Sequence, residues 1–143
     1  MATSPLGSQL AIPPWELAKE LALYLASCGV GTFVPGAVKG NSLFLDRMPD
    51  TPVVATSLVI DPSPRRDPVS RPHFSLYFRD THVATAGARA AIAFSYLHRV
   101  VPPLPSYSLQ CWCDDEPTGH TFNPNGLPVA RLSVSTTGVI RRT

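Results

Sequence analysis

The sequence has little cysteine and little net charge, and each shortage argues against a class of protein. Three cysteines, Cys28, Cys111 and Cys113, are too few and odd in number for a disulfide framework. Twelve basic and ten acidic residues leave a formal charge of +2, which does not favour a nucleic-acid module with a broad basic surface. We therefore expect a reduced, intracellular chain.

Long apolar runs and common catalytic motifs are also missing. The longest apolar stretch, residues 15–26, is interrupted by Glu16, Lys19 and Glu20 and is too short to cross a bilayer. There is no G-x-S-x-G, G-x-x-x-x-G-K-[ST] or G-x-G-x-x-G motif. The four histidines lack metal-ligand spacing, and the C-x-C pair lacks the further donors of a closed zinc site. The sequence thus predicts no membrane span, cofactor, metal site or catalytic residue.

Proline, in contrast, is abundant. Most of the 16 prolines gather at residues 13–14, 49–72 and 102–105, between the periodic segments rather than inside them. With 143 residues, 44% of them apolar, the chain suffices for one domain with a core. We expect a single domain over residues 13–143, preceded by a flexible arm, residues 1–12, of small and polar residues.

The first half contains one helix and two strands. Leu17, Leu21, Tyr24 and Leu25 form a helical stripe, which predicts a helix over residues 14–28 with Gly29 as its C-cap. A brief strand at Leu43 and Leu45, an interior strand over 53–60 and a proline- and arginine-rich loop over 61–72 follow. The loop should join antiparallel neighbours and project from the body.

Residues 71–100 hold a strand and a helix back to back. Phe74, Leu76 and Phe78 alternate with more polar residues, as in a strand with one buried face. Asp80 and Thr81 offer N-cap oxygens to the helix. We expect its apolar stripe to lie on the sheet, with Gly87 allowing close approach. The stripe consists of Val83, Gly87, Ala90, Phe94 and Leu97.

The last third predicts two more strands. Residues 106–115 alternate so that Tyr107, Leu109, Cys111 and Cys113 share one side. An acidic turn and an N-P-N-G turn at 123–126 lead to a final strand over 130–140. The fold class is therefore α+β: an antiparallel β-sheet with two α-helices packed on one face.

Two charged segments are candidate contact sites. Arg65, Arg66 and Arg71, with Asp67 between them, could contact phosphate or a neighbouring subunit's carboxylates, or form a solvated loop. Asp114, Asp115 and Glu116 lack the spaced ligands of a calcium loop and are more typical of a solvated turn. A small enzyme with Cys111 or Cys113 as nucleophile and His120 as base is an alternative of another class.

Three phrases in order resemble a known family. They are ELALYLASCGVGT, SLFLDRMPDTPVVATSLVI and HFSLYFRDTHVATAGARAAIAFSYLH. Together they cover about residues 14–100 and are similar to the minor capsid and tail terminator family of long, non-contractile-tailed bacteriophages and gene transfer agents. The matching positions are Gly29, Gly31, Thr32, Met48, Pro49, Asp50, Pro52, Ala86, Ala90 and Leu97.

The resemblance implies a structural virion protein at the tail–head junction, assembled in the host cytoplasm. It implies a ring of copies of this chain, a hexamer, that caps the tail tube, ends its polymerisation and meets a neck or stopper protein of the head. DNA would pass through the lumen without specific binding. The loop 61–72 and the region 114–126 are then the predicted projecting contacts, although the loop has no counterpart in the family's pattern. Another neck ring, a head completion or stopper protein, is the nearest alternative.

Overall fold

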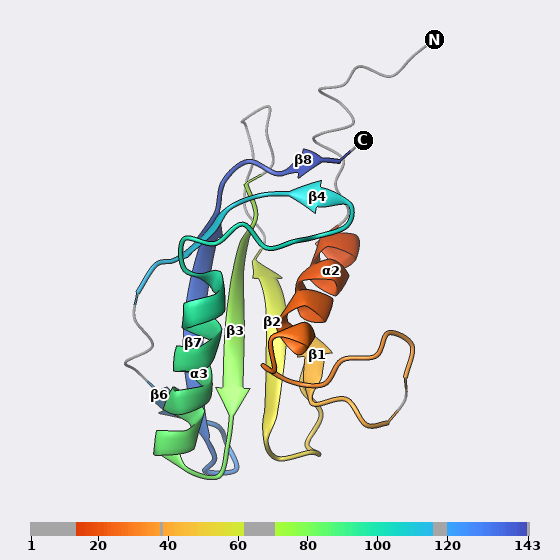
Figure 1. Cartoon of the computed structure of the whole chain (residues 1–143). Coiled ribbons are helices and arrows are strands. Elements are labelled where there is room, and N and C mark those ends of the chain that lie inside the picture. The colour runs from red at the N-terminus through yellow and green to blue at the C-terminus, as the bar shows by residue number, and fades with distance from the viewer. Residues whose placement is uncertain (1–13, 38, 62–70, 116–119, 143) are drawn as a thin grey trace.

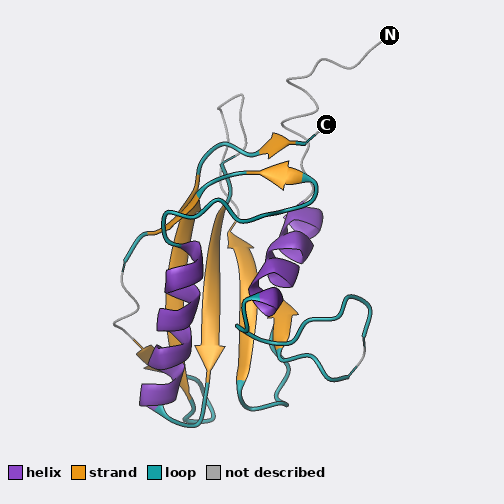
Figure 2. Ribbon diagram, viewed as in Figure 1, coloured by secondary structure: helices purple, strands orange, loops and turns teal. Residues whose placement is uncertain are grey.

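Two helices lie on one face of a β-sheet (Figure 1; Figure 2). The computed structural model describes residues 14–37, 39–61, 71–115 and 120–142. Helix α2 (Pro14–Ser27) covers β1 and β2, and helix α3 (Val83–Leu97) covers β3 and β7. The predicted α+β class is confirmed. The predicted arm over residues 1–12 and most of the loop 61–72 lie outside the described residues.

Within the described residues, the main sheet has six strands, in the order β1-β2-β3-β7-β5, with β6 also paired to β7. Strand β1 forms one edge, whereas β5 and β6 follow each other along the opposite edge of β7. A second sheet pairs β4 with β8. The strands are β1 (Leu43–Leu45), β2 (Ala55–Asp61), β3 (His73–Arg79), β4 (Tyr107–Ser108), β5 (Cys111–Cys113), β6 (His120–Phe122), β7 (Pro128–Thr136) and β8 (Ile140–Arg141).

The sheet is mixed and mostly antiparallel, and it departs from the predicted antiparallel pattern at one edge. Strands β1 and β2 run parallel, with Leu43 opposite Thr56 and Leu45 opposite Leu58. The reason is the segment between them, residues 46–54, which carries the chain back to the starting end of β1 before β2 begins. The other strand pairs of the main sheet are antiparallel, including the predicted β2–β3 pair.

The core lies between the helices and the sheet. Phe74, Leu76 and Phe78 are fully buried on the helix-facing side of β3, as predicted. The other face was predicted to be semi-polar, and two of its residues, Ser75 and Arg79, are buried as well. Leu58 on β2 and Leu132 on β7 stand directly beside Leu76 in the register and are buried too. Burial of each such side chain stabilises the fold by about 1.5–3 kcal/mol, so this row is the centre of the domain.

Helix α2 follows its prediction closely. Leu17, Leu21 and Leu25 are buried, because they recur on one face of the helix. Gly29, at φ 85°, ends it: the Gly29 N–H donates to Ala26 O at 3.1 Å and the Val30 N–H donates to Leu25 O at 3.0 Å. This pair of bonds is a Schellman motif, which places glycine at the left-handed position after the helix.

Helix α3 begins and packs differently from its prediction. His82 is the N-cap residue and makes no side-chain capping bond. Asp80 instead accepts a hydrogen bond from the Thr81 N–H at 2.7 Å, because both residues lie in the turn ahead of the helix. The buried stripe is all alanine and leucine: Ala86, Ala90, Ala93 and Leu97.

Two members of the predicted α3 stripe are therefore wrong. Val83 is exposed, since it lies at the end of the helix that extends past the core. A Cβ added to Gly87 would meet nothing within 4 Å, so this glycine is not where the helix approaches the sheet closely. The alanines allow that approach instead.

The two strands predicted near the C-terminus are each broken. Residues 106–115 divide into β4 and β5, and residues 130–140 divide into β7 and β8. The break occurs at the same level in both, where Thr137 N–H donates to Gln110 O at 3.0 Å and Thr137 Oγ1 accepts from Gln110 N–H at 2.9 Å. The two segments leave the main sheet together and pair again as β4–β8 above it (Figure 1).

The N-P-N-G turn is present as predicted. It joins β6 to β7, with Gly126 at φ 80° and its N–H bonded to Asn123 O at 2.9 Å. Asn123 Oδ1 also accepts hydrogen bonds from the N–H groups of Asn125 and Leu127, at 3.0 and 2.8 Å. The asparagine side chain thus holds the hairpin closed.

Candidate interaction surfaces

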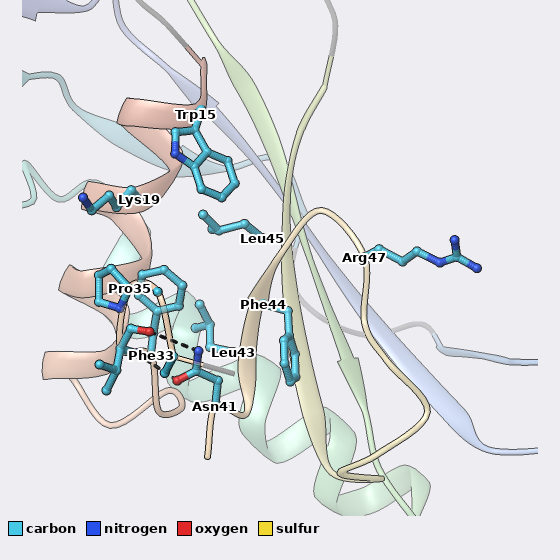
Figure 3. A pocket seen from close by; sticks show the side chains of 12 residues that line it. Trp15, Lys19, Phe33, Pro35, Asn41, Leu43, Phe44, Leu45 and Arg47 are labelled. Atoms are coloured by element: carbon cyan, nitrogen blue, oxygen red, sulfur yellow. Dashed lines mark hydrogen bonds between the residues drawn. The ribbon is translucent and has the colours of Figure 1, made fainter. Parts of the chain in front are cut away.

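A groove runs along the β1 edge of the sheet, between α2 and the segment that precedes β1 (Figure 3). It contains an open pocket of about 320 Å³, and a second hollow of about 290 Å³ adjoins it between Trp15 and Ile60. We call it the β1 groove and define it by apolar lining residues and two rim cations: Trp15, Phe33, Val34, Leu45, Lys19 and Arg47.

The outer wall of the β1 groove is held by specific hydrogen bonds. Asn41 Oδ1 accepts from the Val34 N–H at 2.9 Å, and Asn41 Nδ2 donates to Val34 O at 3.2 Å (Figure 3). Thr32 O accepts from the N–H groups of Ser42 and Leu43, at 2.9 and 3.1 Å. These bonds close residues 32–42 into a loop that stands beside β1, so the groove has a defined shape.

At the opposite edge of the sheet, the outer backbone groups of β5 have hydrogen-bond partners. The Cys111 N–H donates to Val100 O at 2.8 Å, and the Val100 N–H donates to Cys111 O at 3.1 Å. The Cys113 N–H donates to Nδ1 of His98 at 3.1 Å. These contacts cover the outer side of β5, whereas exposed aromatic side chains project from this edge at Trp112 and Phe122.

Asp114, one of the predicted contact residues, is held at the end of β5. It lies 2.8 Å from Nε2 of His73 and accepts a hydrogen bond of 2.6 Å from Oγ of Ser135. Ser135 lies opposite His73 in the β3–β7 register, on the face that carries no helix among the described residues. The serine bonds the carboxylate and not the imidazole, so this is not the serine–histidine pair that activates a nucleophile.

The other predicted contact residues fall into two groups. Arg71 is exposed just before β3, and Asp115 is exposed just after β5. The structure brings this part of the chain to one end of the sheet, because His73 and Trp112 both stand beside Ser135. The remaining predicted residues lie outside the described part of the chain: Arg65, Arg66, Asp67 and Glu116.

The cysteines of the C-x-C pair are core residues. Cys111 and Cys113 are buried, and burial raises the pKa of each thiol to about 12. His120 lies in β6 opposite Ala130, whereas Cys113 lies opposite Val134. Four residues along β7 correspond to about 13 Å of strand. Both observations weigh against a thiolate nucleophile with His120 as its base.

Two arginines, the buried Arg79 and the partly buried Arg89, were not predicted as important. Arg79 donates hydrogen bonds to the carbonyl oxygens of Pro49, Pro52 and Val53 and so holds the loop ahead of β2. Arg89 donates to Arg79 O at 2.9 Å and pairs with the Asp80 carboxylate at 3.3 Å. The sequence did offer a signal for Arg79, because it ends an apolar strand and a buried arginine needs hydrogen-bond partners.

Asp80 is ionised more readily than usual in this setting. Burial opposes the charge, but hydrogen bonds from Thr85 and the Thr81 N–H, together with the Arg89 guanidinium, outweigh it and lower the pKa of the carboxyl. The same burial lowers the pKa of Arg89, against the attraction of Asp80. The pair is structural and joins the end of β3 to α3.

The described part of the chain contains no cluster of three or more His, Cys, Asp or Glu residues that could hold a metal ion. None of its helices combines the length and apolarity needed to cross a membrane. No protein-family model matches the chain, and no curated protein matches it.

Proposed function

We propose that the protein is a tail terminator: a structural virion subunit whose copies form a ring, a hexamer, on the end of a phage tail tube. The ring ends tail polymerisation and presents the surface that joins the neck protein of the head. The proposal starts from the resemblance of three sequence phrases. The contacts that the three segments make with one another in the fold support it.

The three phrases build one half of the domain and meet at its core. The first supplies the second half of α2 and its Gly29 cap, and the second supplies β1, the loop over 46–54 and nearly all of β2. The third supplies β3 and α3. Arg79, in the third phrase, bonds the carbonyl oxygens of the M-P-D-T-P loop in the second. The motifs are therefore parts of one structural unit rather than scattered matches.

The observation that carries the proposal is the difference between the two edges of the sheet. One edge presents the β1 groove, rimmed by Lys19 and Arg47. The other presents exposed Trp112 and Phe122, with the acidic Asp115 at the end of β5. A closed ring needs two different, complementary surfaces on each subunit, because each copy contacts its neighbours head to tail. Two different edges, each with exposed apolar side chains, meet this requirement.

The test is negative-stain imaging of particles from a strain that lacks the gene, beside the wild type and a strain complemented with the intact gene. Overlong or variable tails detached from filled heads are expected, with normal particles restored by complementation. Tails of normal length beside unjoined or leaking heads would move the protein to a head completion or stopper ring. Intact infectious particles would overturn the proposal.

A further inference from the structure

Strand β1 leaves hydrogen-bonding backbone groups at the edge of the sheet. Thr56 N–H donates to Ser42 O and Asp46 N–H donates to Leu58 O, both at 2.8 Å, so the even-numbered residues face β2. Peptide groups alternate in direction along a strand, and those of Leu43 and Leu45 therefore point outward. The Leu43 N–H donates a hydrogen bond to Thr32 O. Among the described residues, the Leu43 carbonyl and the Leu45 N–H have no backbone partner.

These two groups flank Phe44, and in a parallel ladder both would bond one extended residue of the added strand, whereas in an antiparallel ladder they would bond two. In a parallel or antiparallel ladder, an added strand bonds alternate residues of its neighbour, which is how peptides add to exposed sheet edges. The β1 groove lies directly beside this edge and offers apolar surface for the side chains of an added strand (Figure 3). Trp15 is 66% exposed and Val34 55% exposed, so this surface lacks a cover in the described part of the chain.

The sequence supplies a suitable segment at the mouth of the groove. Residues 1–13 precede α2, whose second residue, Trp15, lines both hollows. Residues 1–12 contain no acidic or basic side chain, and Leu6, Leu10 and Ile12 would fall on one side of an extended chain. Twelve extended residues reach about 40 Å, far more than the ~10 Å length of β1. The short tether also gives this segment a high effective concentration at the groove.

We infer that the β1 groove is the binding site of the chain's own N-terminal segment, residues 1–12, which adds as an extended strand beside β1. The segment covers the apolar side chains of Trp15 and Val34 and supplies partners to the Leu43 carbonyl and the Leu45 N–H. In the free subunit the covered edge does not pair with other chains, which protects a small sheet protein from edge-to-edge aggregation. The inference concerns the subunit before assembly: in the proposed ring, the segment would have to leave the groove or lie within the contact between neighbours.

Disulfide trapping in the full-length protein tests this inference. Single cysteines replace Leu6, Leu10 or Ile12, each combined with Val34→Cys in a Cys28→Ser background. The two remaining native cysteines are buried. After mild oxidation, at least one pair is expected to give an intramolecular disulfide, found by peptide mass spectrometry in the monomer band. The matched control is Val101→Cys, since Val101 is also 55% exposed but lies beyond α3.

The outcomes separate the possible occupants. A disulfide formed equally well with Val101→Cys, or with neither valine, would overturn the inference. Disulfides found only between two copies would also overturn it and would identify a neighbour's segment as the occupant. Neither result depends on tail length in particles, so this inference and the proposed function fail separately.

Tryptophan fluorescence gives a second, non-covalent readout. In a Trp112→Phe background Trp15 is the remaining tryptophan, and the double change Leu10→Asp and Ile12→Asp is expected to raise its acrylamide quenching about twofold or more. The control, Ser4→Asp with Ser8→Asp, adds the same charge without removing apolar side chains and is expected to leave quenching unchanged. Equal quenching in both variants would contradict the inference.

Discussion

Arg79 Nη2 lies 2.8 Å from the carbonyl oxygen of Pro52, and this contact joins the end of β3 to the loop between β1 and β2. The same guanidinium bonds the carbonyl oxygens of Pro49 and Val53. The loop must return the chain so that β2 can run parallel to β1. A side chain from a strand far along the sequence thus determines the path of a segment that contains two prolines, Pro49 and Pro52.

Replacing Arg79 with methionine should destabilise the protein by about 3 kcal/mol. The side chain is only 6% exposed, so the three carbonyl oxygens lose a charged donor in a place that water reaches poorly. Urea unfolding followed by circular dichroism measures the change. Arg47→Met is the control, since Arg47 is exposed on the rim of the β1 groove and its replacement should cost less than about 0.5 kcal/mol. Equal effects of the two changes would show that Arg79 does not hold the loop.

Two glycine-to-alanine changes should have opposite effects. A Cβ on Gly31 would lie 3.0 Å from Cβ of Leu43, against a fully buried side chain, and should lower the free energy of unfolding by about 1–3 kcal/mol. A Cβ on Gly87 meets nothing within 4 Å in the interior of α3 and should raise stability by about 0.5–1 kcal/mol. Thermal and urea unfolding compare the two. A loss of stability in Gly87→Ala would mean that α3 packs more closely than described.

The buried thiols predict a loss of stability in alkali. Burial raises the pKa of Cys111 and of Cys113 from 9.0 to about 12. Between pH 9 and pH 12, the thiols lose their protons in the unfolded protein but keep them in the folded protein. This contribution to stability is therefore complete below pH 9 and is lost as the pH rises toward 12, by about 1 kcal/mol per pH unit for each thiol.

Urea unfolding at pH 8 and pH 10.5 measures this slope. Cys111→Ala leaves a small cavity and lowers stability at every pH, but it should also make the loss between the two pH values smaller than in the wild type. An unchanged slope would rule out the buried thiol as its cause. Thiol labelling at neutral pH is an independent check: Cys28, which is less buried, should react first, and the other two should react only on unfolding.

Local periodicity was sufficient to predict the elements that carry most of the core. Leu17, Leu21 and Leu25 recur at helical spacing, and Phe74, Leu76 and Phe78 alternate at strand spacing, so each pattern selects one conformation. Gly29 and the N-P-N-G turn were predicted for the same reason, because each residue type satisfies a local backbone requirement. The stripe of α3 was partly wrong because alanines bury as readily as larger residues where the helix lies close to the sheet.

The candidate contact surface was predicted less well. Charge and proline drew attention to the loop 61–72 and the acidic turn, of which Arg71, Asp114 and Asp115 are described. The β1 groove was missed, although Trp15 stands outside the apolar stripe of its helix and so offered a signal. Phe33 and Val34 gave none, because they lie in an irregular segment whose position beside β1 depends on the bonds of Asn41 and Thr32.

The sequence by itself determined the two helices, the long strands β2 and β3 and the common side of the C-x-C cysteines, since these follow from spacing along one segment. Only the tertiary structure decided the parallel β1–β2 pair, the division of the C-terminal strands between two sheets and the open edge at Leu43 and Leu45. Each of these depends on contacts between residues far apart in the chain, such as Arg79 with Pro52 and Gln110 with Thr137. No local pattern encodes such contacts, because their free energy arises only when the segments meet.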